Sequence, residues 1–256
     1  MLNATQTGSG PDLVLLHGWG LNQAIWQGVA EQLASHYTLH LVDLPGYGSN
    51  NDWAGLLDLN TVTQAVINSV PPGAIWLGWS LGGMVALNAT AEGADISRLI
   101  LTAATPKFCQ ASDWPGGVEA HVLEQFSEEL KQNHKLTLLR FLALQARGSD
   151  RARDEVRILR EAVFVNGEPA PQALAAGLEI LQYDDLRTTA PRISQPVLII
   201  NGLRDSLIPI EAADWFGQNL SNCTIREIVG AGHAPFLSHP DQFIAALDGF
   251  CKGAVL

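Results

Sequence analysis

The sequence predicts an α/β fold in which a mostly parallel sheet is covered by helices on both faces. Short continuous apolar runs alternate along the chain with segments in which apolar residues recur at helical spacing. At 256 residues with 47% hydrophobic and 16% charged residues, the chain can bury a substantial core as one domain.

The first half of the chain follows this alternation. Strands are expected at 13–16, 38–44, 74–79 and 99–101, where each apolar run ends at a turn. Helices are expected at 25–33, at 62–69 and directly after Ser80, where apolar residues recur every three or four positions. Strands that alternate with helices are typical of parallel pairing.

The pattern changes after Pro106, because residues 118–181 contain helical periodicity only. The alternation resumes with strands at 197–200 and 224–229 and a last helix that begins at Pro240. We therefore expect an α/β core formed by residues 1–107 and 187–256, with residues 108–186 inserted as a helical lid.

Composition excludes several function classes. A net charge of −11 argues against nonspecific nucleic-acid binding, and no run of about 18 apolar residues predicts a membrane span. The first ten residues lack a signal-peptide pattern, and Cys109, Cys223 and Cys251 form neither a disulfide framework nor a zinc motif. We expect a cytoplasmic monomer with reduced cysteines. Without a Walker loop or a metal-spaced histidine pair, no cofactor and no metal are expected.

The charge is unevenly distributed. Residues 131–160 hold eight of the 15 basic residues and three acidic ones, a local charge of +5 in a chain of net charge −11. Arg153, Arg157 and Arg160 follow one another at helical i, i+4, i+7 spacing, so one helix face can present three guanidinium groups. The alternative is a solvated helix face whose arginines pair with Asp154 and Glu155.

Ser80 is the candidate nucleophile. It lies in Gly78-Trp79-Ser80-Leu81-Gly82, between an apolar strand and a helical segment. This strand–turn–helix setting is the context in which a Gly-x-Ser-x-Gly sequence projects a serine hydroxyl from the edge of a sheet. An ordinary serine in a tight turn is the alternative.

A serine needs a base, and the base needs a carboxylate that fixes its tautomer. His233 follows the strand at 224–229, and Asp205 follows the strand at 197–200. The order Ser80, Asp205, His233 is the one this architecture uses. Three other acidic residues are alternatives for the carboxylate: Asp184, Asp185 and Asp214.

An acyl-transfer site also needs two N–H donors for the oxyanion. The backbone of Leu81, directly after the serine, is expected to supply one and the backbone of Trp19 the other. His17 is interpreted as a structural residue that braces the Trp19 loop, and Asp43 as one that holds its own turn by hydrogen bonds to the backbone.

These residues resemble the α/β-hydrolase family. The resemblance rests on His17-Gly18-Trp19, on the sequence around Ser80, on Asp205 and on Gly232-His233. It implies a sheet of eight strands in full form. Since only ten residues precede Pro11, one or two N-terminal strands are expected to be shortened or missing.

A narrower resemblance extends into the lid. Residues 76–83, 140–145, 177–181 and 233–240 are similar to the pimeloyl-[acyl-carrier protein] methyl ester esterases of biotin synthesis. That family implies a serine carboxylesterase that frees the pimeloyl carboxylate and methanol. The implied partner is an acyl carrier protein bearing the phosphopantetheine-linked acyl methyl ester. The implied substrate contacts are Trp19, Ser80, Leu81, Phe141, Leu142, Ala143, Leu144, Gln145 and His233.

The same resemblance implies that Arg140, Arg153 and Arg157 dock the carrier protein. The chain departs from the family at Asn50, where a serine is common, and at Leu136, where a further lid arginine is expected and Lys135 is a substitute. Two alternatives remain: a generic short-chain carboxylesterase or thioesterase, and a catalytically silent α/β-hydrolase that serves as a binding module.

Overall fold

The computed structural model describes residues 1–253 and contains one seven-stranded sheet with the order β1-β3-β2-β4-β5-β6-β7. Strands β2 to β7 pair in parallel, as predicted, and β1 pairs antiparallel with β3. The strands are β1 (Ala4–Gly8), β2 (Asp12–Leu16), β3 (Thr38–Val42), β4 (Ala74–Trp79), β5 (Ile96–Thr102), β6 (Val197–Gly202) and β7 (Cys223–Ile228).

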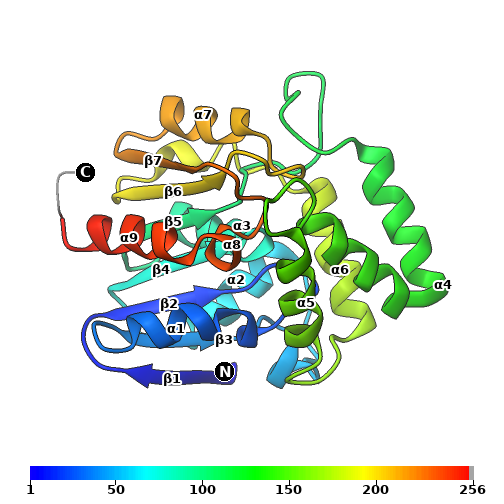
Figure 1. Ribbon diagram of the computed structural model, residues 1–256, viewed down its shortest axis with the longest axis horizontal. Helices are drawn as coiled ribbons and strands as arrows, with labels where there is room; N and C mark the ends of the chain where they lie inside the picture. The colour runs from blue at the N-terminus through cyan, green and yellow to red at the C-terminus, as the bar shows by residue number, and fades with distance from the viewer. Residues whose placement is uncertain (254–256) are drawn as a thin grey trace.

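The helices of the α/β core lie on both faces of this sheet (Figure 1). Helix α1 (Gln27–Leu33) lies beside α9 (Pro240–Cys251), and α2 (Leu59–Ile67) packs on α3 (Leu81–Ala91) across the sheet from them. Helix α7 (Ile210–Asn219) packs on β6 and β7. The short elements are η1 (Gln23–Trp26), η2 (Gly48–Asn50), η3 (Ala190–Arg192) and α8 (Pro235–Ser238).

Strand β1 lies within the ten residues that precede Pro11. All five of its residues are exposed, so the segment lacks the apolar run that marked the other strands. It is held at the edge by pairing with β3 and by Asn50, whose Oδ1 accepts a hydrogen bond from the Asn3 N–H at 2.8 Å. The residue that departs from the family pattern therefore anchors the first strand.

Three helices come between β5 and β6 along the chain. They lie beyond the edge of the sheet where the parallel strands end (Figure 1). They are α4 (Ala120–Gln145), α5 (Ala152–Val163) and α6 (Pro171–Tyr183). Helix α4 is interrupted at Asn133, with φ of −156° and ψ of 86°. The division into a core and a lid at residues 107/108 and 186/187 stays a prediction.

The length and polarity of each helix decide whether it could cross a membrane. In the part of the chain that the structure describes, every helix is too short or too polar to cross a bilayer.

Candidate active site

Ser80 lies between β4 and α3 with a strained backbone. Its φ of 55° and ψ of −117° are rare for a residue with a side chain, and such a conformation costs of order 1–3 kcal/mol. The strain is held from both sides, because the Ser80 N–H donates to the Thr102 carbonyl at 3.1 Å and the Ser80 carbonyl accepts from the Met84 N–H at 3.1 Å. This is the sharp strand-to-helix turn that the sequence predicts.

Two glycines allow this turn to pack closely. A Cβ at Gly82 would lie 2.5 Å from the carbonyl oxygen of His17, and one at Gly78 would lie 2.4 Å from the carbonyl oxygen of Gly82. Real Cβ contacts are not this short, so only glycine fits. A Cβ at Gly18 would lie 3.3 Å from the Ser80 Cβ, which places the loop that carries Trp19 directly beside the serine.

Asp205 and His233 form a buried pair at the ends of β6 and β7. Nδ1 of His233 is 2.8 Å from Oδ2 of Asp205, and the two side chains are 0% and 1% exposed. Oδ1 of Asp205 accepts hydrogen bonds from the N–H groups of Leu207 and Ile208 at 2.8 and 3.0 Å. A carboxylate is an acceptor, so Oδ2 of Asp205 accepts a hydrogen bond from the ring, which places the histidine proton on Nδ1. Nε2 then carries the lone pair of a general base.

The other three carboxylates are not placed this way. Asp185 forms ion pairs with Arg187 and Lys107, which together hold its pKa at about 2. Asp184 is the residue that follows α6, and Asp214 lies within α7. Of the four candidates weighed from the sequence, the structure brings Asp205 to the histidine.

Trp79 connects the serine turn to His233. The indole Nε1 of Trp79, the residue before the serine, donates to the His233 carbonyl at 2.8 Å. Ser80 is 4% exposed, and within residues 1–253 Nε2 of His233 is buried without a hydrogen-bond partner. A serine–histidine hydrogen bond is absent from the described residues. Such bonds are often long without substrate and tighten when it binds.

Two backbone N–H groups beside Ser80 are free to bind an oxyanion. Leu81 is the first residue of α3, so its N–H lacks an acceptor within the helix. Across residues 1–253, neither the Leu81 N–H nor the Trp19 N–H donates a backbone hydrogen bond. Both donors proposed from the sequence are therefore available.

His17 and Asp43 are structural, as expected. His17 is buried, with Nδ1 2.9 Å from the Gly18 carbonyl, and its Nε2 accepts from the Leu44 N–H at 3.0 Å. Burial lowers its pKa, so the ring stays neutral. Asp43 holds its turn by accepting hydrogen bonds from the N–H groups of Gln23 and Ser49.

The end of α4 packs against this site. The Trp19 indole donates to the Leu174 carbonyl of α6 at 2.9 Å, and its ring meets that of Phe141 edge-on at 4.7 Å. The His233 N–H donates to the Gln145 carbonyl at 3.3 Å, while both polar atoms of the buried Gln145 side chain lack partners among the described residues. The end of α4 thus covers the histidine and leaves a buried, unpartnered amide at Gln145.

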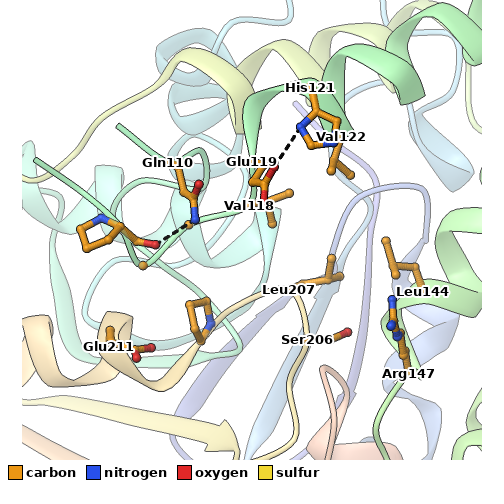
Figure 2. A pocket seen from close by; sticks show the side chains of 14 residues that line it. Gln110, Val118, Glu119, His121, Val122, Leu144, Arg147, Ser206, Leu207 and Glu211 are labelled. Atoms are coloured by element: carbon orange, nitrogen blue, oxygen red, sulfur yellow. Dashed lines mark hydrogen bonds and ion pairs between the residues drawn. The ribbon is translucent and has the colours of Figure 1, made fainter. Parts of the chain in front are cut away.

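A pocket of about 590 Å³ adjoins the site (Figure 2). Its wall combines Leu144 and Arg147 at the end of α4 with Ser206 and Leu207, which directly follow Asp205. Neither Ser80 nor His233 lines it. The volume suits a small ligand, and the pocket lies between the Asp205 loop and a predicted substrate contact, Leu144.

The three lid arginines predicted to dock a carrier are on the surface. Arg140 pairs with Glu129 at 2.6 Å and Arg157 with Glu161 at 3.1 Å, whereas Arg153 lacks an ion-pair partner within residues 1–253. Lys135, the proposed substitute for a missing arginine, pairs with Glu168 at 2.7 Å.

The alternative in which Glu155 pairs with arginines on a solvated face is wrong. Glu155 is 1% exposed and accepts a hydrogen bond from the Ser149 hydroxyl. It shares the inner face of α5 with Leu159, Ala162 and Val163, at i, i+4, i+7 and i+8 spacing. That spacing is a signal in the sequence that assigns Glu155 to the buried face.

The fold and this arrangement define a class of protein. Residues 13–246 match the model of the alpha/beta hydrolase family, and the chain belongs to that family. Solved structures agree on the fold: an esterase from Exiguobacterium antarcticum has a TM-score of 0.89 at 24% identity, covering 98% of this chain and 95% of that one.

Curated relatives point to a narrower group within this family. A pimeloyl-[acyl-carrier protein] methyl ester esterase from Xanthomonas axonopodis pv. citri (strain 306) is 46% identical over 243 residues, which cover 95% of this chain and 96% of that protein. A protein of the same name from Nitrosomonas europaea is 42% identical over 246 residues, covering 94% and 96%. The similarity includes α4 to α6, where hydrolases of this fold usually diverge.

Proposed function

We propose that this protein is a serine carboxylesterase that hydrolyses the methyl ester of a pimeloyl group carried by an acyl carrier protein. The observation that carries the proposal is the 46% identity over 95% of the chain to a protein of that name. The buried Asp205–His233 pair and the strained turn at Ser80 support it independently, because these groups supply what ester hydrolysis requires.

The reaction begins with attack of the Ser80 hydroxyl on the ester carbonyl. Nε2 of His233 takes the hydroxyl proton, and Asp205 stabilises the imidazolium through Nδ1. The N–H groups of Trp19 and Leu81 bind the oxyanion. His233 then protonates the departing methoxide oxygen, which leaves as methanol. Water activated by the same histidine cleaves the acyl-enzyme, which frees the carboxylate and restores Ser80.

Charge supports the choice of partner. Arg140, Arg153 and Arg157 lie on the surface of α4 and α5, in the segment of charge +5. Acyl carrier proteins are strongly acidic, and complementary charge steers encounter and fixes orientation. The carrier thus binds the outside of α4 and α5, while the acyl chain contacts the end of α4, where Phe141, Leu142 and Gln145 are buried.

The test compares kcat/KM for a carrier-linked methyl pimeloyl ester with kcat/KM for a small soluble ester. We expect the carrier-linked ester to be preferred by at least about tenfold, with the preference falling as salt rises. Equal values would favour a generic esterase. Absence of hydrolysis, together with no labelling of Ser80 by an organophosphonate, would favour a silent binding module.

A further inference from the structure

Glu155 is a buried acid that the proposed reaction does not use. It lies on the inner face of α5, and the only hydrogen bond its carboxylate makes within residues 1–253 comes from Ser149 to Oε1. Its other oxygen, Oε2, is buried without a partner in that part of the chain. A buried carboxyl with an unpaired oxygen is costly unless it stays protonated.

Ser149, the hydrogen-bond partner of Glu155, lies in the segment 145–150, which packs against the loop that carries His233 (the histidine loop). A Cβ at Gly232 would lie 3.3 Å from the Ser149 Cβ, so the serine packs against the residue before His233. On either side of Ser149, the Gln145 carbonyl accepts from the His233 N–H at 3.3 Å, and the Asp150 N–H donates to the Gly230 carbonyl at 3.0 Å. Residues 145–150 thus contact the histidine loop at three points.

The same helix carries the predicted docking arginines. Arg153 and Arg157 are exposed on the outside of α5, two residues before and two residues after Glu155, which points inward. The inward side chain of Glu155 therefore connects this helix to Ser149 and, through Ser149, to the histidine loop.

We propose that Glu155 is a positioning residue for His233, joining α5 to the histidine loop through its hydrogen bond with Ser149. The inference rests on the proposed role of His233 as the general base. It assigns to the lid a second task besides contact with substrate.

Ionisation of Glu155 adds a pH dependence. The charged groups that face it are Asp205 and His233, and the neutral hydroxyls are those of Ser149 and Ser238. Burial raises the pKa of Glu155 to about 7, while the Ser149 hydrogen bond and the charge of His233 oppose that rise. A carboxylate formed there adds a negative charge near the ring that acts as the base, which couples the ionisation of Glu155 to the reaction.

The experiment uses Glu155→Gln, which keeps the shape and cannot ionise, and Glu155→Ala, which removes the contact. Asp154→Asn is the matched control, because Asp154 is an exposed carboxylate on the same helix. The first readout is the pH profile of kcat/KM on a small ester, which does not need carrier docking. The second is amide hydrogen exchange of residues 230–239, which does not need activity.

For Glu155→Gln we expect the acidic limb of the profile to move to lower pH by about 0.5–1 unit, with kcat at pH 8 kept within about threefold. For Glu155→Ala we expect kcat to fall about tenfold or more with KM little changed, and exchange of residues 230–239 to quicken. Asp154→Asn should match the wild type in both readouts.

Two results would overturn the inference: a Gln variant whose acidic limb coincides with that of Asp154→Asn, or an Ala variant whose loop exchanges as the wild type does. A wild-type protein without esterase activity would instead contradict the proposed function. Loop exchange in the Ala variant would still decide whether Glu155 holds His233.

Discussion

At the scale of single residues, the site depends on a close approach of three backbone segments. The strained turn at Ser80 is possible because Gly78 and Gly82 let β4, α3 and the end of β2 approach within distances that no Cβ permits. The sequence predicts this arrangement because the Gly-x-Ser-x-Gly pattern lies between an apolar strand and a helical segment.

Replacement of Gly82 by alanine tests this packing. Its added Cβ would meet two backbone carbonyl oxygens at 2.5 and 2.6 Å, which cannot rotate away. We expect Gly82→Ala to lower the free energy of unfolding by about 3 kcal/mol or more and to abolish esterase activity. The measurement is urea denaturation monitored by circular dichroism.

Gly28→Ala is the control for that change. A Cβ at Gly28, in α1, would meet nothing within 4 Å. Alanine there should be neutral or stabilise by up to about 1 kcal/mol, because it lowers the conformational entropy of the unfolded chain. Equal stability of the two variants would show that the close approach at Gly82 does not limit the fold.

Residue-level prediction from sequence succeeded where topology restricts the choice. Asp205 and His233 each follow a parallel strand, and such strands bring their carboxyl ends to one edge of the sheet, so their pairing at 2.8 Å could be expected. Glu155 was misjudged because a glutamate beside arginines on a helix is usually solvated. Its partner Ser149 lies outside the helix, and helical spacing gives no information about such contacts.

At the scale of elements, we propose that the two faces of α5 have different roles. Its outer face carries Arg153 and Arg157, and its inner face carries Glu155 and the apolar residues that pack on the core. Changes on the outer face should therefore alter recognition of the carrier without altering the chemical step.

Charge reversal on this face tests the separation. We expect Arg153→Glu together with Arg157→Glu to lower kcat/KM for the carrier-linked ester by about tenfold or more, because attraction becomes repulsion. Hydrolysis of a small ester should change by less than about twofold. Steady-state kinetics on both substrates make the comparison.

Arg192→Glu provides the same change of charge elsewhere. Arg192 is exposed in η3, which packs on α3. This variant should leave both substrates near wild-type rates. Equal losses on both substrates in the α5 variant would indicate a folding or lid defect instead of lost docking.

Element-level prediction also had a clear limit. Six of the strands were expected because they contain apolar runs or apolar residues at alternate positions, whereas β1 has the sequence Ala-Thr-Gln-Thr-Gly and is exposed along its length. Its pairing depends on β3 and on the long-range hydrogen bonds of Asn50. Contacts of that kind leave no periodic pattern in the sequence.

At the scale of the whole molecule, the buried carboxyl of Glu155 links stability to pH. Its pKa of about 7 in the folded protein exceeds the ordinary value of 4.5. Between these values the folded state keeps a proton that the unfolded state gives up, so the free energy of unfolding falls as pH rises from 4.5 to 7. Above pH 7 Glu155 is ionised in both the folded and the unfolded state, so the free energy of unfolding stays lowered by the cost of burying the carboxylate.

Glu155→Gln removes this contribution. Relative to the variant, the wild type should lose roughly 1–3 kcal/mol of unfolding free energy between pH 5 and pH 8. Denaturant titrations at the two pH values measure the difference, and Asp154→Asn should behave as the wild type. Parallel pH dependence in wild type and Gln variant would mean that Glu155 does not titrate in this range.

The central claim, that Ser80 opens a carrier-bound methyl ester, is tested most directly by methanol release from methyl pimeloyl-carrier with wild-type and Ser80→Ala protein. We expect the wild type to release one methanol per ester, and the variant to fold normally yet lose at least about 10³-fold in kcat. Release by purified, folded Ser80→Ala at a rate near that of the wild type would contradict the claim.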